Sequence, residues 1–104
     1  MSRKRQMILE VLSGPSDGAV ITLEKDTHWR QTGQGPLAFP WDVELGEPQA
    51  RFIAQEDGWY IEGIDALHGT YLRGNRDGRI GKKMKLERYD ILEASYTWLR
   101  LEMV

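Results

Sequence analysis

The amino-acid sequence predicts a single all-β domain, a sandwich of two twisted, mainly antiparallel sheets. Eleven glycines and four prolines divide the 104 residues into pieces that are too short for helices of average length. Within these pieces apolar and polar side chains alternate with a period of two, which is the pattern of a half-buried strand. Turn sequences at residues 14–18, 57–58 and 77–78 separate several of the pieces. Short strands at such close spacing are typical of a β-sandwich.

Each predicted strand has one apolar face. We expect residues 7–11 and 99–103 to be central strands, and we expect Phe52 and Trp59 to be buried between the sheets. The alternating apolar positions, in chain order, are Met7, Leu9 and Val11; Ala19, Ile21 and Leu23; Ala50, Phe52 and Ala54; Trp59 and Ile61; and Leu99, Leu101 and Met103.

One segment has an alternative interpretation. Residues 82–92 contain no glycine or proline and are long enough for two or three helical turns. We expect strand and turn there, because a helix would be the only one in the chain. Residues 33–40 form a loop of low polarity, and residues 1–6 form a flexible basic tail, so the folded domain is expected to span residues 7–104.

Composition limits the classes of function. Hydrophobic residues make up 40% and charged residues 29%, which is the balance of a soluble globular protein. The formal net charge of −2 argues against nucleic-acid binding, and no apolar run reaches the roughly 18 residues of a membrane span. The chain has no cysteine and its start does not resemble a signal peptide. We therefore expect a cytoplasmic protein, or the cytosolic domain of a larger one, without membrane contact of its own.

The sequence contains no pattern typical of a catalytic or metal site. His28 and His68 are the only histidines, they lie 40 residues apart, and neither has a closely spaced metal-ligating partner. No serine lies in a nucleophile-elbow sequence. The many carboxylates are typical of a solvated face. We therefore expect no enzyme activity, no cofactor and no bound metal.

The order of the segments resembles the forkhead-associated (FHA) domain, a β-sandwich of about a hundred residues. The resemblance implies that loops at one end of the sandwich bind a partner, which in this family is a phosphothreonine peptide. Residues 14–23 are similar to the opening hairpin of the family. The other matching segments are Thr32-Gly33-Gln34, Asp42-Val43-Glu44-Leu45, Gln49-Ala50-Arg51-Phe52, Gly58-Trp59-Tyr60-Ile61, His68-Gly69-Thr70-Tyr71-Leu72-Arg73-Gly74, Tyr89-Asp90-Ile91-Leu92 and Leu99-Arg100-Leu101-Glu102.

The departures from the family pattern fall on the residues that read the phosphate. The family's arginine is replaced by Gln34, its serine by Gly46, and its loop-supporting histidine by Gln49. Its asparagine is replaced by His68, and the small hydroxyl residue before that motif by Ala66. Glu47 stands where the family often has a second arginine. Gly33, Gly69 and Thr70, which resemble fold-supporting positions, are retained.

The resemblance therefore predicts a phosphate-independent protein–protein interaction domain with a scaffold or docking role. Similar degenerate domains occur in bacterial secretion machinery, so a secretion or signalling assembly is the setting that we expect. The partner is another protein or another domain of a larger chain. The candidate partner-binding residues at the former phosphopeptide end are Gln34, Phe39, Trp41, Gly46, Glu47, Gln49, Ala66, Leu67, His68 and Arg73.

The sequence also leaves other functions open. Arg51, Arg73 or Arg76 would preserve phosphopeptide binding if one of them replaced the missing arginine. Exposed tryptophans, with Trp41 and Trp98 as candidates, would favour binding to nucleic-acid bases or to sugars. A purely structural element of a larger chain is the last alternative.

Overall fold

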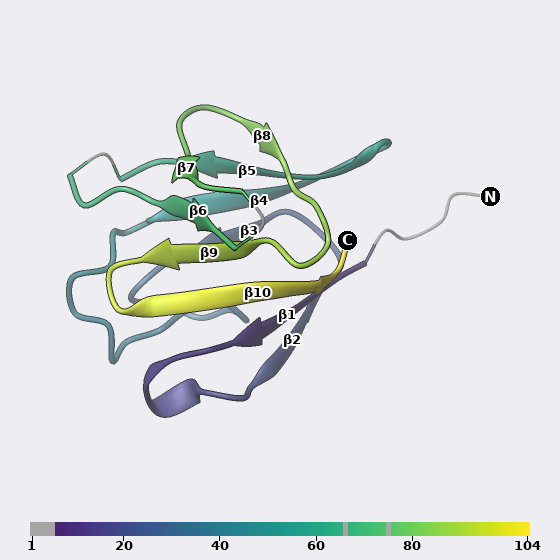
Figure 1. Ribbon diagram of the computed structural model, residues 1–104. Coiled ribbons are helices and arrows are strands. Elements are labelled where there is room, and N and C mark those ends of the chain that lie inside the picture. Colours follow the sequence, from purple (N-terminus) through teal and green to yellow (C-terminus); the bar gives the residue numbers. More distant parts are fainter. Residues whose placement is uncertain (1–5, 66, 75) are drawn as a thin grey trace.

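The computed structural model describes residues 6–65, 67–74 and 76–104, and its strands form two sheets (Figure 1). A short 3-10 helix, η1, follows the first strand. The elements are β1 (Met7–Val11), η1 (Gly14–Ser16), β2 (Val20–Leu23), β3 (Thr27–Trp29), β4 (Ala50–Gln55), β5 (Gly58–Gly63), β6 (Tyr71–Arg73), β7 (Gly78–Arg79), β8 (Met84–Lys85), β9 (Ile91–Ala94) and β10 (Thr97–Met103).

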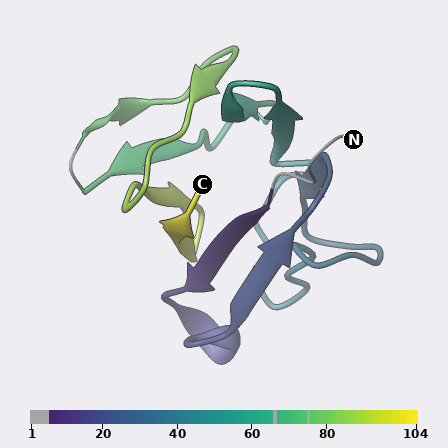
Figure 2. The ribbon, with the colours of Figure 1, turned by 90° about the vertical axis from the view of Figure 1, so that its right-hand side faces the viewer.

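The predicted two-sheet sandwich is confirmed. One sheet has the strand order β2-β1-β10-β9-β6-β7, the other has the order β3-β4-β5-β8, and all neighbouring named strands pair antiparallel. Figure 2 views the sheets from the end that carries the C-terminus. Strands β1 and β10 pair with each other inside the larger sheet, as the sequence predicted for residues 7–11 and 99–103.

The core lies between the two sheets and follows the period-two pattern. Met7, Leu9 and Val11 are buried along β1, while the residues between them are only partly covered. Phe52 and Trp59 are completely buried, which confirms the two core positions that the sequence predicted. The Phe52 ring stacks on the ring of Trp29 with a centroid distance of 6.2 Å.

Residues 82–92 form strands and turns and not the alternative helix. The Leu86 amide donates to the Trp59 carbonyl, so β5 satisfies the backbone of this segment. Buried Asp90 accepts hydrogen bonds from the Arg76 guanidinium and the Glu87 amide, which holds the turn before β9. In the described part of the chain no helix is long and apolar enough to cross a membrane.

Three connections meet at one end of the sandwich, which we call the loop end. It consists of residues 41–47 from the β3–β4 connection, the described residues 64–65 and 67–69 from the β5–β6 connection, and residues 95–96 from the β9–β10 turn. Buried Asp42 joins two of them, because its carboxylate accepts hydrogen bonds from the Ser95 hydroxyl, the Tyr96 amide and the Thr97 hydroxyl. In Figure 1 these loops lie on the left, while the C-terminus lies on the right.

Candidate interaction surface at the loop end

Gln49 holds the β3–β4 and β5–β6 connections together from inside the protein. Its side-chain oxygen accepts a hydrogen bond from the Gly46 amide at 2.7 Å. Its side-chain nitrogen donates to the Gly69 carbonyl and the Thr70 hydroxyl, both at 3.0 Å. The Gln49 carbonyl also accepts from the amides of residues 64 and 65. Gln49 therefore supports the loops in the position where the FHA resemblance implies a histidine.

Gln49 cannot touch a partner directly, which corrects its place among the candidate binding residues. Its side chain is completely buried, and each of its polar groups already has a partner within the protein. The sequence alone does not separate a residue that contacts a partner from one that supports the contacting loop, because both follow the same loop motif.

Asp65 covers the position at which the family carries a serine. A Cβ atom built on Gly46 would lie 2.6 Å from the Cβ of Asp65 and closer still to its Oδ2. Gly46 is buried beneath this side chain, so a larger residue fits only if Asp65 moves. The other carboxylate oxygen of Asp65 accepts a hydrogen bond from the Leu67 amide at 2.9 Å, which fixes the side chain. A carboxylate therefore lies where the resemblance implies a phosphate-binding hydroxyl.

A second carboxylate, that of Glu47, occupies the other side of the same connection. It accepts hydrogen bonds from the Thr32 hydroxyl, the Thr32 amide and the Arg30 guanidinium. The Thr32 hydroxyl, together with Arg30, lowers the pKa of Glu47 below its ordinary value, so the carboxylate is ionised at neutral pH. The ion pair with Glu47 also neutralises Arg30. Gln34 is exposed in the loop beyond Thr32.

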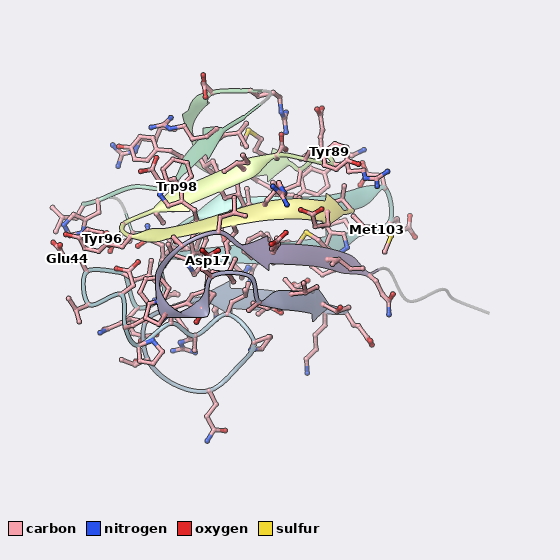
Figure 3. All side chains as sticks on the ribbon, turned by 60° about the horizontal axis from the view of Figure 1, so that its bottom comes forward. Asp17, Glu44, Tyr89, Tyr96, Trp98 and Met103 are labelled. Atoms are coloured by element: carbon pink, nitrogen blue, oxygen red, sulfur yellow. The ribbon has the colours of Figure 1, made fainter. Side chains whose placement is uncertain are left out.

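Apolar side chains project into solvent around these carboxylates. Val43 is 71% exposed, Leu67 is 83% exposed and Tyr96 is 62% exposed, and each comes from a different connection. Figure 3 places Tyr96 next to Glu44 at this end, with Tyr89 and Met103 at the opposite end. Leu67 was among the predicted candidates. Val43 and Tyr96 were missed, because the family motif assigns Val43 to a strand and the position of the β9–β10 turn was not predicted.

The Phe39–Trp41 loop is part of the protein interior, which corrects the prediction that it forms the partner surface. Phe39 is only 3% exposed and belongs to the core, and its ring packs edge-on against Trp41 at 5.9 Å. Trp41 is half-buried and donates a hydrogen bond to the Ser16 hydroxyl of η1 at 3.1 Å. The low-polarity loop therefore packs its two rings against the core.

The remaining candidates differ in their accessibility. His68 is exposed, and its Nε2 lies 3.8 Å from a carboxylate oxygen of Glu44, so the β3–β4 and β5–β6 connections approach each other there. Arg73 is half-buried, forms an ion pair with Glu93 at 3.2 Å and lies over the Tyr71 ring. Ala66, like residues 1–5 of the predicted tail, lies outside the described residues.

The three arginines considered as substitutes for the family's phosphate-binding arginine have carboxylate partners. Arg51 lies 3.6 Å from Glu62, and Arg76 lies 2.6 Å from buried Asp90. Since Arg73 pairs with Glu93, each of the three has an ion pair within the protein. The partners lower the capacity of these side chains to bind a phosphate.

The tryptophans are not exposed as the nucleic-acid and carbohydrate alternative requires. Trp29 and Trp59 are completely buried in the core. Trp41 and Trp98 are half-buried, so the expectation of an exposed Trp98 is only partly met. The described residues also contain no group of three His, Asp or Glu side chains that could hold a metal ion.

Comparisons with known proteins identify the fold. No family model matches the chain, and no curated protein matches it. Among solved structures, it is similar to the FHA domain of a hypothetical protein from Arabidopsis thaliana, with a TM-score of 0.78 and 17% identity over 95% of this chain and 86% of that one. An FHA domain from Chlamydia trachomatis gives a TM-score of 0.76 and 16% identity over 96% and 99% of the two chains.

A third similar structure comes from a study of phosphothreonine-dependent FHA domain interactions. Its TM-score is 0.73, and its identity is 13% over 96% of this chain and 98% of that one. The three similarities extend over nearly the whole length of the chain and support the two-sheet sandwich described above. This chain has the fold of the FHA domains.

Proposed function

We propose that this protein is a phosphate-independent docking domain that binds another protein through the loop end and catalyses no reaction. The observation that carries the proposal is the combination of exposed Val43, Leu67 and Tyr96 with carboxylates at the positions where a phosphate reader needs donors. The proposal includes a scaffold role in a larger assembly, such as a secretion or signalling complex, in line with the resemblance.

Exposed apolar side chains support docking because they gain free energy when a partner removes them from water. Each large apolar side chain contributes about 1.5–3 kcal/mol when it is fully buried. Val43, Leu67 and Tyr96 come from three connections, and the buried side chains of Asp42 and Gln49 hold these connections in place. A surface that is rigid before binding loses little conformational entropy on association.

Other residues of the loop end, at the positions of the family's phosphate-binding side chains, weaken phosphate binding. A hydrogen bond to a charged group contributes about 1.5–3 kcal/mol, so losing the arginine and serine donors removes roughly 3–6 kcal/mol. A micromolar complex has about 8 kcal/mol in total, and the remainder corresponds to millimolar affinity or weaker. The carboxylates of Glu47 and Asp65 add repulsion against a phosphate dianion.

We expect no specific binding of phosphothreonine peptides. Titration of a phosphothreonine peptide library, followed by calorimetry and by amide chemical shifts, should give dissociation constants weaker than about 1 mM. The unphosphorylated peptides serve as the control. Binding tighter than about 50 µM that is lost on dephosphorylation and moves the resonances of Gln34 or His68 would contradict the proposal.

Restoring the family residues should restore some affinity only if Asp65 is changed as well. The triple variant Gln34→Arg, Gly46→Ser and His68→Asn leaves the new serine in collision with the Asp65 side chain. Adding Asp65→Ala removes this collision and one negative charge. We therefore expect the quadruple variant to bind phosphothreonine peptides more tightly than the triple variant in the same titration.

The docking surface can be tested even while the natural partner is unidentified. A display library of random peptides is selected on the wild-type domain, and the enriched peptides are titrated against Leu67→Asp, Tyr96→Asp and the control Tyr89→Asp. Tyr89 is also an exposed tyrosine but lies at the opposite end (Figure 3). We expect the two loop-end variants to weaken binding about tenfold or more and the control to leave it unchanged.

All three variants change exposed side chains, so their melting temperatures should remain close to that of the wild type. Enriched peptides whose affinity falls with Tyr89→Asp, and not with the two loop-end variants, would show that the docking surface lies elsewhere.

A further inference from the structure

A shallow depression at the loop end differs in chemistry from the apolar residues beside it. Its volume is about 290 Å³, and its lining comes from the three connections of the loop end and from strands β6 and β9. The lining residues are Glu44, His68, Tyr71, Glu93, Ser95 and Tyr96. Two carboxylates, two phenol rings, an imidazole and a hydroxyl therefore surround one space.

The two carboxylates of the depression have different partners. Glu93 forms an ion pair with Arg73 at 3.2 Å, which balances its charge. Glu44 has no Lys or Arg partner in the described part of the chain, where its one ion-pair contact is His68 at 3.8 Å. The side chain of Glu44 is about half exposed, so a cation can approach it from solvent. The charge of Glu44 is thus available to a partner.

One of the two aromatic rings of the depression is open to a cation. The guanidinium groups of Arg73 and Arg79 lie 4.9 Å and 5.9 Å from the centre of the Tyr71 ring, so that ring already has cation partners from its own chain. The Tyr96 ring lies beside Glu44 (Figure 3) and is largely exposed. A cation near Glu44 would therefore meet both a carboxylate and an open aromatic face.

We propose that this depression accepts a lysine or arginine side chain of the partner protein's docking segment. The basic side chain would lie between the Glu44 carboxylate and the Tyr96 ring, and apolar neighbours in the same segment would contact Val43 and Leu67. The inference rests on the docking function proposed above and specifies its partner chemistry. Charge complementarity is the reason for this occupant, because a phosphate or an acidic side chain would be repelled by Glu44.

The sharpest test reverses one charge. The peptide library is selected separately on the wild-type domain, on Glu44→Lys, and on the matched control Asp77→Lys. Asp77 is exposed and lies in the connection after β6, whereas His68 in the depression lies in the connection before β6. We expect lysine or arginine at one recurrent position in peptides from the wild type and the control, and aspartate or glutamate at that position in peptides from Glu44→Lys.

Titrations then measure the size of the effect. A basic peptide enriched on the wild type should bind Glu44→Gln about fivefold more weakly, and the same peptide with norleucine in place of its lysine should lose a similar factor. Its affinity for the wild type should fall as salt is added, because the ion pair is partly exposed. Glu44→Gln keeps the shape of the side chain and serves if Glu44→Lys does not fold.

The outcomes separate the two proposals. Peptides that shift the amides of Val43, Leu67 and Tyr96 but show no preference for a basic residue would overturn the cation inference and leave the docking function intact. Peptides that shift only residues at the opposite end, or a failure to enrich any peptide, would overturn both. A phosphopeptide that binds in the depression more tightly than the basic peptides would overturn both as well.

Discussion

Replacing Gln49 with alanine is expected to lower the free energy of unfolding by about 2–6 kcal/mol. The change removes the partners of two buried backbone groups, the Gly46 amide and the Gly69 carbonyl. A buried group left without a partner costs about 1–3 kcal/mol, and the change also opens a small cavity. Urea titration followed by tryptophan fluorescence measures the loss, and amide hydrogen exchange should rise most at the loop end.

Matched variants separate the contribution of the Gln49 hydrogen bonds to stability from the contribution of its side-chain volume. Gln49→Met preserves the size of the side chain and removes its donor and acceptor, so it should lose most of the stability that alanine loses. Gln49→His introduces the residue that the FHA resemblance implies at this position, and it should retain more stability than Gln49→Met. Equal stability of wild type and Gln49→Met would show that the buried amide does not hold the loops.

Replacing Phe52 with alanine is expected to cost about 3–5 kcal/mol. Phe52 is completely buried in the middle of β4, where it pairs with Ile61 of β5 and Thr27 of β3. Its ring also stacks on Trp29, and such aromatic pairs contribute about 0.5–1.5 kcal/mol beyond the area they bury. Chemical denaturation, with the β-sheet signal in circular dichroism as the readout, measures the effect.

The control for Phe52 is a smaller change at the same place. Phe52→Leu retains an apolar side chain and should cost clearly less than alanine, because it leaves a smaller cavity. A loss below about 1 kcal/mol for Phe52→Ala would be too small for a core aromatic residue and would contradict the packing described above.

The strands were predictable because their signal is local. Met7, Leu9 and Val11 alternate with polar neighbours, and a strand that buries one face must place such alternate residues inward. The completely buried Phe52 and Trp59 follow from the same rule. The helix considered for residues 82–92 did not form, because the backbone there pairs with β5. That pairing joins segments far apart in the chain, and no local pattern reports it.

The loop end was predictable in its position but not in the role of each residue. Of the candidate residues, Leu67 and His68 are exposed there, while Gln49 and Phe39 are buried. Phe39 was assigned to the partner surface because its apolar, proline-containing loop stands where the FHA family has a polar loop. A loop has no period that separates inward from outward side chains, so the sequence did not reveal that Phe39 is buried. Val43 is apolar, but its side chain is exposed. Its neighbour Asp42 is the residue that is buried, where its carboxylate accepts a hydrogen bond from the Tyr96 amide.

Residue types and local patterns were enough to predict the all-β class and the strands along the core. These properties depend on each residue and on its neighbours close in the chain. The folded arrangement was needed to show that Asp65 covers Gly46, that Glu47 neutralises Arg30, and that Glu44 and Tyr96 line the same depression. Each of these contacts joins residues from different parts of the chain, and their geometry depends on how the two sheets and their loops pack in space.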